Sequence, residues 1–454
     1  RIAVAAIWIA LIPVAGKYVI LGISALLIIS ISSGFLVIAA FLACMVIFVF
    51  PLFLLGTVTP SLARFTMDSV DDSGKIVGTL GAYNTIGSII GTFLPTFVTI
   101  PSVGTSITFL IFAGILLLLS ILYFVSTKQR SIKCIAGVLI LILATLFSAK
   151  DSFAFWENNL LYEGESIYNY LQVKEDEESV ILSTNVLFGV QSILMKNDEL
   201  TGMYYDYAMA APLMADVNKR KDPKMLVLGM GTGTYAKQCK KYFPAMQTTG
   251  VEIDEKITEL AGTYFELPRD IPVVTYDGRA YLNADREKYD VILVDAYQDI
   301  TIPFQMSGVE FFELVKEHLT EGGVMVVNMN MQTDEPDNIC DYLEDTIASV
   351  FQNVYTVRVK NNTNCELFAS ENPAVMETYT GALDAMEENE LKNFLQDVSG
   401  NITAYSGGDR ILTDDRAPVE LLGMQVIDSI IKRELAYYQR VYREEGLDGI
   451  KKAL

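Results

Sequence analysis

Glycines and acids follow four apolar runs in this 454-residue chain, at positions where they could bind a nucleotide or nucleoside. The first segment, GMGTGTYAKQC, places Gly229, Gly231 and Gly233 at alternate positions. Glycine lets the backbone pass close to a ligand, and the N–H groups at the start of a following helix would face that ligand. The pattern predicts a ligand-binding turn, although an ordinary tight turn between a strand and a helix has the same form.

Acids follow the next three apolar runs. Glu252 stands about 20 residues beyond the glycines, where an acid can accept both hydroxyls of a ribose. Asp277, which precedes Gly278, could accept an adenine amino group, and Asp295 opens the run Asp-Ala-Tyr-Gln-Asp that ends at Asp299. A glycine turn and three acids at successive strand ends are more specific together than any one of these residues.

Alternating strands and helices must position these side chains. The segments KMLVLGM, TTGVEID, IPVVTYD, YDVILVDAY and GVMVVNMN read as strands, and helical stretches such as AKQCKKYF separate them. This alternation predicts a doubly wound, mostly parallel α/β sheet of the Rossmann type over 223–375, with ligands beyond the carboxyl ends of the strands. A small β-rich segment over 151–222 is expected before it, and a helical extension over 376–454 after it.

Residues 1–150 have a different composition from the rest of the chain. They hold eight Lys or Arg against three Asp, whereas the remaining residues hold 26 basic and 52 acidic side chains. Bilayer-spanning helices need about 20 apolar residues. The segments 35–59, 77–100, 105–127 and 132–149 qualify, and 2–31 forms one broken span or two short ones. Because the first three segments carry no charge in mid-span, an α-helical multi-span membrane anchor is favoured over a transport pathway.

The orientation of this anchor is open. Lys and Arg in the connections 60–76 and 128–133 place both in the cytoplasm by the positive-inside rule. If 132–149 then crosses the cell membrane, the acidic part of the chain lies outside the cell. A supply of nucleotide cofactor favours the cytoplasmic side instead.

The charge and the few His and Cys residues narrow the functions. Nucleic-acid binding needs clustered Lys and Arg, which the acidic part lacks. A small cationic ligand fits better, although the charge could also serve solubility alone. The five cysteines show no C-x-x-C spacing, and the only histidine, His318, is expected to be structural. We therefore expect no metal site.

Several segments together resemble a known family. GMGTGT, VEIDE, TYDGRAYL and VDAYQDITIP, preceded by SIYNYLQV and followed by GGVMVVN, resemble the spermidine synthase (aminopropyltransferase) family in order and spacing. The segments FPLFLLGTVTP, GAYNTIGSIIGTFLP and ILTDDRAPVELL resemble a bacterial subfamily in which a multi-span helical domain precedes the synthase-like domain. The resemblance implies a fold of the class I methyltransferase and spermidine synthase type, and a homodimer.

The resemblance also implies an activity and a site. The family moves an aminopropyl group from decarboxylated S-adenosylmethionine to a small amine such as putrescine, and Asp295 maps to the base that keeps the attacking nitrogen unprotonated. The implied donor-binding residues are Gly229, Gly231, Thr232, Gly233, Glu252, Asp277, Gly278 and Asp295. The implied substrate-binding residues are Tyr168, Asn169, Asp206, Tyr297, Gln298 and Asp299.

Other positions depart from the family pattern. The family's G-G-G-D-G-G loop holds the donor ammonium through its Asp, and Thr232 takes that position here. The family's Y-Q pair becomes Tyr168-Asn169, and its H-E pair becomes Tyr205-Asp206. Thr232 would tolerate the carboxylate of intact S-adenosylmethionine, so this molecule is an equal candidate ligand.

Two functions follow from these residues. The first is a membrane-anchored transferase that uses an adenosyl-sulfonium donor and a small cationic acceptor. The alternative is a non-catalytic sensor or transport-associated domain that binds a polyamine or nucleoside and is held at the lipid bilayer by the same helices.

Overall fold

The computed structural model divides the chain into two compact units with different architectures. The first unit comprises residues 1–158, 163–170 and 432–454, and the second comprises 159–162 and 171–431. The structure describes all residues except 31–34, 68–72, 130, 149–151, 155–156, 158, 185–188, 198, 298–301, 331–332, 334–335, 361, 427–435, 438–439, 442, 445 and 447–454.

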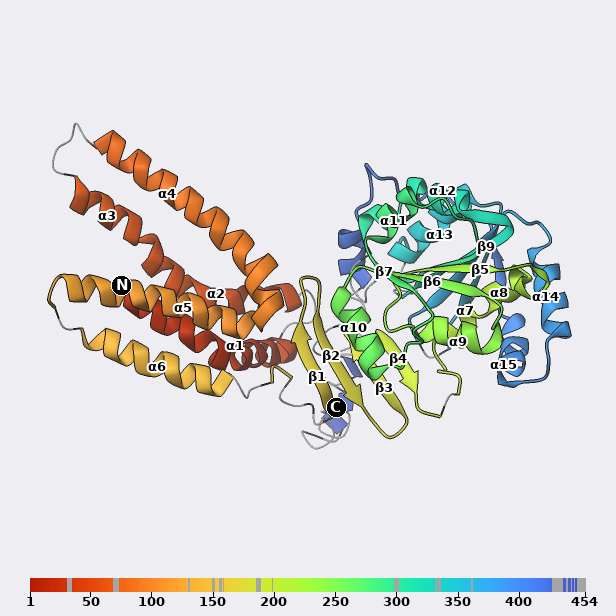
Figure 1. Cartoon of the computed structure of the whole chain (residues 1–454), viewed down its shortest axis with the longest axis horizontal. Coiled ribbons are helices and arrows are strands. Elements are labelled where there is room, and N and C mark those ends of the chain that lie inside the picture. Colours follow the sequence, from red (N-terminus) through yellow and green to blue (C-terminus); the bar gives the residue numbers. More distant parts are fainter. Residues whose placement is uncertain are drawn as a thin grey trace. The chain divides into compact units, whose positions relative to one another are not determined.

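Apolar helices build the described part of the first unit (Figure 1). They are α1 (Ile2–Ser30), α2 (Phe35–Gly56), α3 (Val58–Thr66), α4 (Ser73–Leu94), the π-helical turn η1 (Pro95–Thr99), α5 (Ile100–Ser126) and α6 (Ile132–Ser148). By length and composition alone, Ile2–Ser24, Ile38–Thr66 and Ser73–Ser126 are long enough to cross a membrane, and α6 is shorter. Gly104 has a non-helical backbone, with φ 81° and ψ 165°. This kink lies between the segments 77–100 and 105–127 that the sequence predicted as separate spans.

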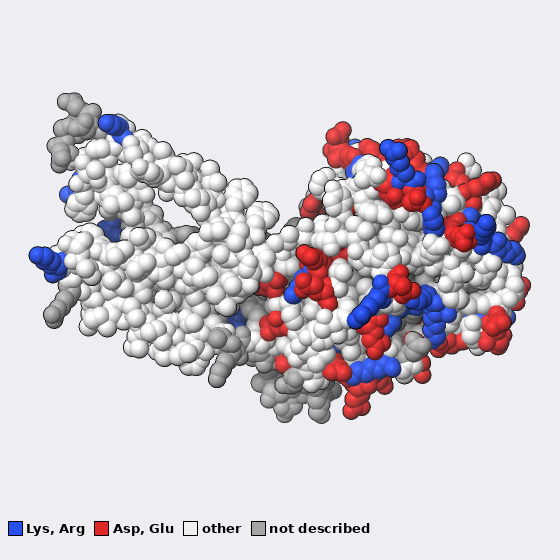
Figure 2. Space-filling model, in the orientation of Figure 1, with Lys and Arg blue, Asp and Glu red and all other residues white. Residues whose placement is uncertain are grey.

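Small side chains let four of these helices pack closely. Helix α1 contacts α2, α5 and α6, and Ala10 of α1 shares a small core with Leu110, Ala113 and Ala144. Within the described residues of α3 and α4, none is buried. The space-filling view shows few charged side chains over these helices and many over the second unit (Figure 2). The face of these helices that Figure 2 shows is therefore mostly apolar.

A small antiparallel sheet precedes the large sheet in the chain. Its order is β1 (Leu160–Glu165), β2 (Tyr170–Glu175), β3 (Ser179–Ser183) and β4 (Ser192–Met195). Asp176 closes the turn between β2 and β3, where its Oδ1 accepts the backbone N–H groups of Glu178 at 2.9 Å and Ser179 at 2.6 Å. Helix α10 (Glu255–Tyr264) packs Ile257 and Leu260 against the strands β2 and β3.

The larger sheet has eight strands among the described residues and is mostly parallel. Strands β7, β6, β5, β8 and β9 are parallel neighbours, and β11, β10 and β12 continue the sheet antiparallel at the β9 edge. The predicted Rossmann-like sheet is confirmed, whereas its antiparallel edge was not predicted. The strand bounds are β5 (Lys224–Leu228), β6 (Gln247–Glu252), β7 (Val273–Thr275), β8 (Tyr289–Val294), β9 (Leu319–Met329), β10 (Asn353–Arg358), β11 (Cys365–Ser370) and β12 (Thr403–Tyr405).

Helices cover both faces of this sheet, as a doubly wound fold requires. One face packs under α7 (Tyr204–Ala208), α8 (Ala210–Met214), η2 (Val217–Lys219), α9 (Thr234–Tyr242), α14 (Val375–Ala385) and α15 (Glu390–Ser399). The other packs under α11 (Gly278–Ala284), η3 (Phe304–Met306), α12 (Val309–Glu317) and α13 (Ile339–Val350). Because β12 lies within 376–454, the extension is not purely helical. A three-residue edge strand is too short to give a periodic sequence signal.

The strand order reverses between β5 and β8, which is where such sheets form their ligand crevice. Gly229, directly after β5, has φ 87°. A Cβ atom at Gly229 would lie 2.6 Å from the backbone carbon of Asp295 and 2.7 Å from the backbone nitrogen of Ala296. The two strand ends therefore approach closely only because this residue is glycine.

We expect Gly229→Ala to lower the free energy of unfolding by about 2 kcal/mol or more, since it adds both a clash and an unfavourable φ. Gly381→Ala in α14 is the matched control, because nothing lies within 4 Å of its added Cβ. Alanine there should leave the chain as stable or more stable, by up to about 1 kcal/mol. Thermal melting of the purified full chain compares the two variants, and equal melting temperatures would contradict the close approach.

Candidate active site

The glycine turn follows β5 at the point where the strand order reverses between β5 and β8. Gly229, Gly231 and Gly233 all have positive φ, at 87°, 54° and 87°. The N–H of Gly231 donates to Oε2 of Glu252 at 2.8 Å, and the N–H of Thr232 donates to Oγ of Ser192 at 3.1 Å. The turn is thus held in shape by two side chains, one from β6 and one from β4.

Glu252 ends β6 and is buried beside this turn. Its Oε1 accepts the N–H of Asp254 at 3.0 Å, while Oε2 accepts that of Gly231. Burial raises the pKa of Glu252, and these backbone donors oppose the shift. An ionised carboxylate offers about four lone-pair positions, so both oxygens retain capacity for hydroxyl donors.

Asp277 lies at the end of the next strand in the sheet and caps α11. Its Oδ1 accepts the N–H of Ala280 at 2.8 Å, and Oδ2 faces Nε2 of Gln305 at 3.4 Å. Gly278, the first residue of α11, packs within reach of Met306, whose Cε would lie 3.2 Å from an added Cβ. Asp277 therefore has a structural role as a helix cap, and Oδ2 remains only weakly engaged.

Asp295 follows β8 and is buried, with 9% of its surface exposed. Its Oδ2 accepts the hydroxyl of Tyr204 at 2.8 Å, and Oδ1 accepts Nδ2 of Asn328 at 2.8 Å. Burial raises the pKa of Asp295 to about 7, the hydrogen bonds from Asn328 and Tyr204 oppose that shift, and the negative charge of Glu252 adds to it. A carboxyl with this pKa exchanges a proton near neutral pH, as a general base does.

The amide of Asn328 is oriented by a second asparagine. Oδ1 of Asn328 accepts Nδ2 of Asn364 at 2.7 Å, which leaves Nδ2 of Asn328 directed at Asp295. Both asparagines are buried. The sequence patterns predicted no role for Tyr204, Asn328 or Asn364. Asn328 is the next-to-last residue of β9, and a polar residue after the apolar run GGVMVV was the available signal.

Thr232 is buried, with 1% of its surface exposed, and its Oγ1 has no hydrogen-bond partner among the residues that the structure describes. An unpaired buried hydroxyl is costly. This hydroxyl in the glycine turn is therefore a candidate partner for a bound ligand.

Two residues from the predicted substrate set are already engaged within the second unit. Asp206 is fully buried and accepts hydrogen bonds from the N–H groups of Thr201 and Gly202, from the Thr201 hydroxyl and from Nε2 of Gln238. Tyr297 is 1% exposed, and its hydroxyl donates to the carbonyl of Met306 at 2.9 Å. The structure therefore places both side chains in the core.

The other four predicted substrate residues lie outside the described part of the second unit. Tyr168 and Asn169 belong to the first unit, where their backbone N–H groups donate to Oγ of Ser166. Gln298 and Asp299 lie outside the described residues. The candidate site in the second unit thus consists of the glycine turn, Glu252, Asp277 and Asp295.

In the described part of the chain, no group of three or more His, Cys, Asp or Glu side chains is placed to hold a metal ion. The nitrogens of His318 face the carbonyl oxygens of Leu314 at 2.8 Å and Asp285 at 3.3 Å. His318 therefore joins the end of α12 to the segment before β8, which is the structural role expected of it.

The strand order, the glycine turn and the acids after β6, β7 and β8 define a Rossmann-like domain of the class I methyltransferase and spermidine synthase type. Residues 202–367 match the family model described as "Spermine/spermidine synthase domain". The chain is 52% identical over 351 residues to the "Probable polyamine aminopropyl transferase" of Bifidobacterium longum, a match that covers 74% of this chain and 78% of that protein. The chain belongs to the polyamine aminopropyltransferase (spermidine synthase) family.

More distant relatives match smaller shares of the chain. The "Polyamine aminopropyltransferase" of Vibrio vulnificus is 24% identical over 300 residues, which cover 63% of this chain and 98% of that protein. A crystal structure of a probable spermidine synthase from Corynebacterium glutamicum shares 21% identity and a TM-score of 0.41, over 55% of this chain and 96% of that one.

Asp206→Asn tests the structural role of this carboxylate. An amide at this position would turn an N–H group toward the N–H of Gly202 or Thr201, so we expect a loss of about 2 kcal/mol of stability. Asp270→Asn, which removes an exposed acid paired with Lys240, should leave the melting temperature close to that of the parent. If Asp206→Asn and this control have the same melting temperature, the four hydrogen bonds to Asp206 do not stabilise the fold.

Proposed function

We propose that the protein transfers an aminopropyl group from an adenosyl-sulfonium donor to a small amine, with Asp295 as the general base. Membership of the polyamine aminopropyltransferase family supports the reaction class. The single observation that supports the role of Asp295 is its buried carboxyl, which lies at the strand-order reversal and has a pKa of about 7.

The residues of the crevice fit such a donor. The positive φ values of Gly229, Gly231 and Gly233 let the backbone of the turn approach a ligand, and the Oγ1 of Thr232 is a buried hydroxyl that needs a partner. Glu252 would accept the ribose hydroxyls, and Asp277 would accept the adenine amino group. When bound, the donor supplies a carbon whose bond to sulfur breaks as the acceptor nitrogen bonds to that carbon, with sulfur keeping the electron pair.

Asp295 would handle the proton of the acceptor. An amine enters the site as an ammonium and must lose a proton before its lone pair can attack. The ionised carboxylate of Asp295 would attract the ammonium and accept this proton, while Tyr204 and Asn328 fix its two oxygens. When the pKa of a base lies near the working pH, a useful fraction of it is ionised and that ionised form is still basic enough to accept a proton.

Thr232 bears on the choice of donor. Its neutral hydroxyl can donate to a carboxylate or accept from an ammonium, so decarboxylated S-adenosylmethionine and S-adenosylmethionine both remain to be assayed. Putrescine is the first acceptor to use, because the related proteins are named for polyamines.

The rate should rise with pH through an apparent pKa of about 7, because only ionised Asp295 accepts the proton. Release of methylthioadenosine from decarboxylated S-adenosylmethionine and putrescine measures this rate. Tyr204→Phe removes a hydrogen bond that favours the ionised form, so it should move the apparent pKa upward. Asp295→Asn should lower kcat/KM by about a hundredfold or more.

A pH profile that is flat from 5 to 9, or full activity in Asp295→Asn, would exclude Asp295 as the base. Saturable binding of putrescine with no product from either donor would favour the non-catalytic sensor instead.

We further propose that the apolar helices anchor the protein in the cell membrane, with the synthase-like unit in the cytoplasm. Large side chains such as Phe41, Phe53 and Ile132 are 61%, 68% and 82% exposed, and a surface of this kind is suited to lipid. The cytoplasmic side follows from the supply of the donor. Helix α6 has 17 residues, near the lower limit of about 17–25 for a span.

A reporter that is active on only one side of the membrane, fused after Leu454, tests this orientation. We expect activity in the cytoplasm, together with cofractionation of the chain with membranes after washing at high pH. Reporter activity outside the cell would mean that 132–149 crosses the membrane, as the positive-inside rule indicates. It would contradict the proposed transferase function, since the donor is not supplied there.

A further inference from the structure

Glu366 is a buried acid that the site described above does not use. It lies in β11 with 0% of its surface exposed. Neither of its carboxyl oxygens has a hydrogen-bond partner among the described residues. A buried carboxyl without a partner costs several kcal/mol relative to a paired one, so its position requires an explanation.

The sheet register places Glu366 in one row with Asp295. Glu366 lies directly opposite Asn328 in the pairing of β11 with β9. Val294 lies opposite Val327 in the parallel pairing of β8 with β9, so the next residues, Asp295 and Asn328, are also neighbours. Two strand spacings of about 4.8 Å separate Asp295 from Glu366, or ~10 Å between their Cα atoms.

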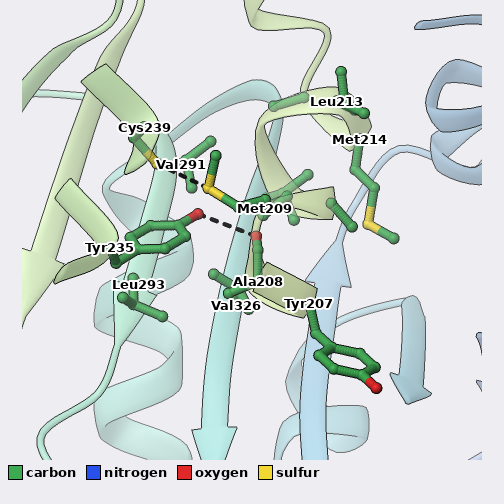
Figure 3. Close-up of a cluster of buried hydrophobic side chains, with 14 of the residues drawn as sticks. Tyr207, Ala208, Met209, Leu213, Met214, Tyr235, Cys239, Val291, Leu293 and Val326 are labelled. Carbon is green, nitrogen blue, oxygen red and sulfur yellow. Dashed lines mark hydrogen bonds between the residues drawn. The ribbon is translucent and has the colours of Figure 1, made fainter. Parts of the chain in front are cut away.

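The neighbouring polar groups are committed to other partners. The amide of Asn328 bonds to Asp295 and Asn364. Burial raises the pKa of Tyr235 well above its ordinary value, and the nearby charge of Glu366 adds to that shift. The hydroxyl of Tyr235 donates to the carbonyl of Ala208 at 3.1 Å (Figure 3). The same close-up shows that apolar side chains, among them Val326 of β9 and Met209, fill this face of the sheet around Tyr235.

Two carboxyls therefore flank Asn328 on one face of the sheet. Asp295 receives two protein donors, whereas Glu366 receives none among the described residues. An acceptor with two cationic nitrogens, one for each carboxyl, would supply the missing partner. A charged hydrogen bond to a buried acid is among the stronger contacts available to a ligand.

We propose that Glu366 selects acceptors that carry a second cationic nitrogen, by binding that remote ammonium while Asp295 serves the reacting nitrogen. This inference rests on the proposed function and assigns Glu366 as a specificity-determining residue. Burial and the charge of Asp295 hold the pKa of Glu366 well above its ordinary value. These two effects favour the protonated form of Glu366, whereas the arriving ammonium favours its ionised form and so the release of a proton.

Calorimetric titration of the full chain in detergent micelles, with 1,4-diaminobutane and with 1-aminobutane, tests the proposal. The two amines have the same carbon chain and differ only in the second nitrogen. In Glu366→Gln we expect the Kd of the diamine to rise about tenfold or more, and that of the monoamine to change little. Repeating the titration in buffers of different ionisation enthalpy counts protons, and the variant should release fewer of them with the diamine.

Glu344→Gln is the matched control. Glu344, on α13, is also a buried acid, and burial together with the nearby Asp341 and Asp345 raises its pKa to about 7. Its substitution should leave the Kd of both amines and the number of protons released on binding unchanged. Equal binding of the two amines to the parent chain, no binding of either, or an unchanged preference in Glu366→Gln would each overturn the role of Glu366.

A failure of the proposed transferase function can be distinguished from a failure of the role of Glu366. If the parent chain forms no methylthioadenosine from any donor but keeps its preference for the diamine through Glu366, the inference stands for a binding site and the transferase does not. If product forms and Glu366→Gln keeps the same ratio of diamine to monoamine turnover, the transferase stands and Glu366 is only a protonated core residue.

Discussion

The buried carboxyl of Asp295 is the interaction on which the rest of the site depends. Burial raises its pKa, and the hydroxyl of Tyr204 and the amide of Asn328 hold the pKa near neutrality. These two donors come from α7 and β9, so the site exists only when the helix and both strands are in register. Gly229 completes the constraint, because any larger residue would force β5 away from the end of β8.

Acidic side chains gather around this carboxyl among the described residues of the site. Glu252 lies close enough to raise the pKa of Asp295, and Asp295 in turn raises that of Glu366. A crevice of this kind disfavours anions and favours a sulfonium donor and ammonium acceptors, since each cation relieves the repulsion among the acids. The acidic composition of the chain beyond residue 150 is consistent with the same preference, although most of the acids that the structure describes there are exposed.

The sequence predicted the parts of the site that local spacing encodes. The glycine turn, Glu252, Asp277 and Asp295 each end a strand of a recognisable pattern, and the structure places them along one crevice. Tyr204, Asn328 and Glu366 could not be found in this way, because they act through partners 33 to 91 residues distant in the chain or through strand pairing. The resemblance assigned Asp206 and Tyr297 to the substrate, whereas the structure engages both in the core. Strand order at the β10–β12 edge also depends on long-range pairing that local patterns do not encode.

The protonation state of Asp295 tests this account most directly. Infrared difference spectra of the parent chain and Asp295→Asn, recorded from pH 4 to pH 9, isolate the carboxyl stretch of this one residue. We expect the protonated band to disappear with a midpoint at a pKa of about 7. A midpoint near 4, the ordinary value for an exposed aspartate, would contradict the account, because the carboxyl would then be neither buried nor suited to accept a proton from the acceptor amine.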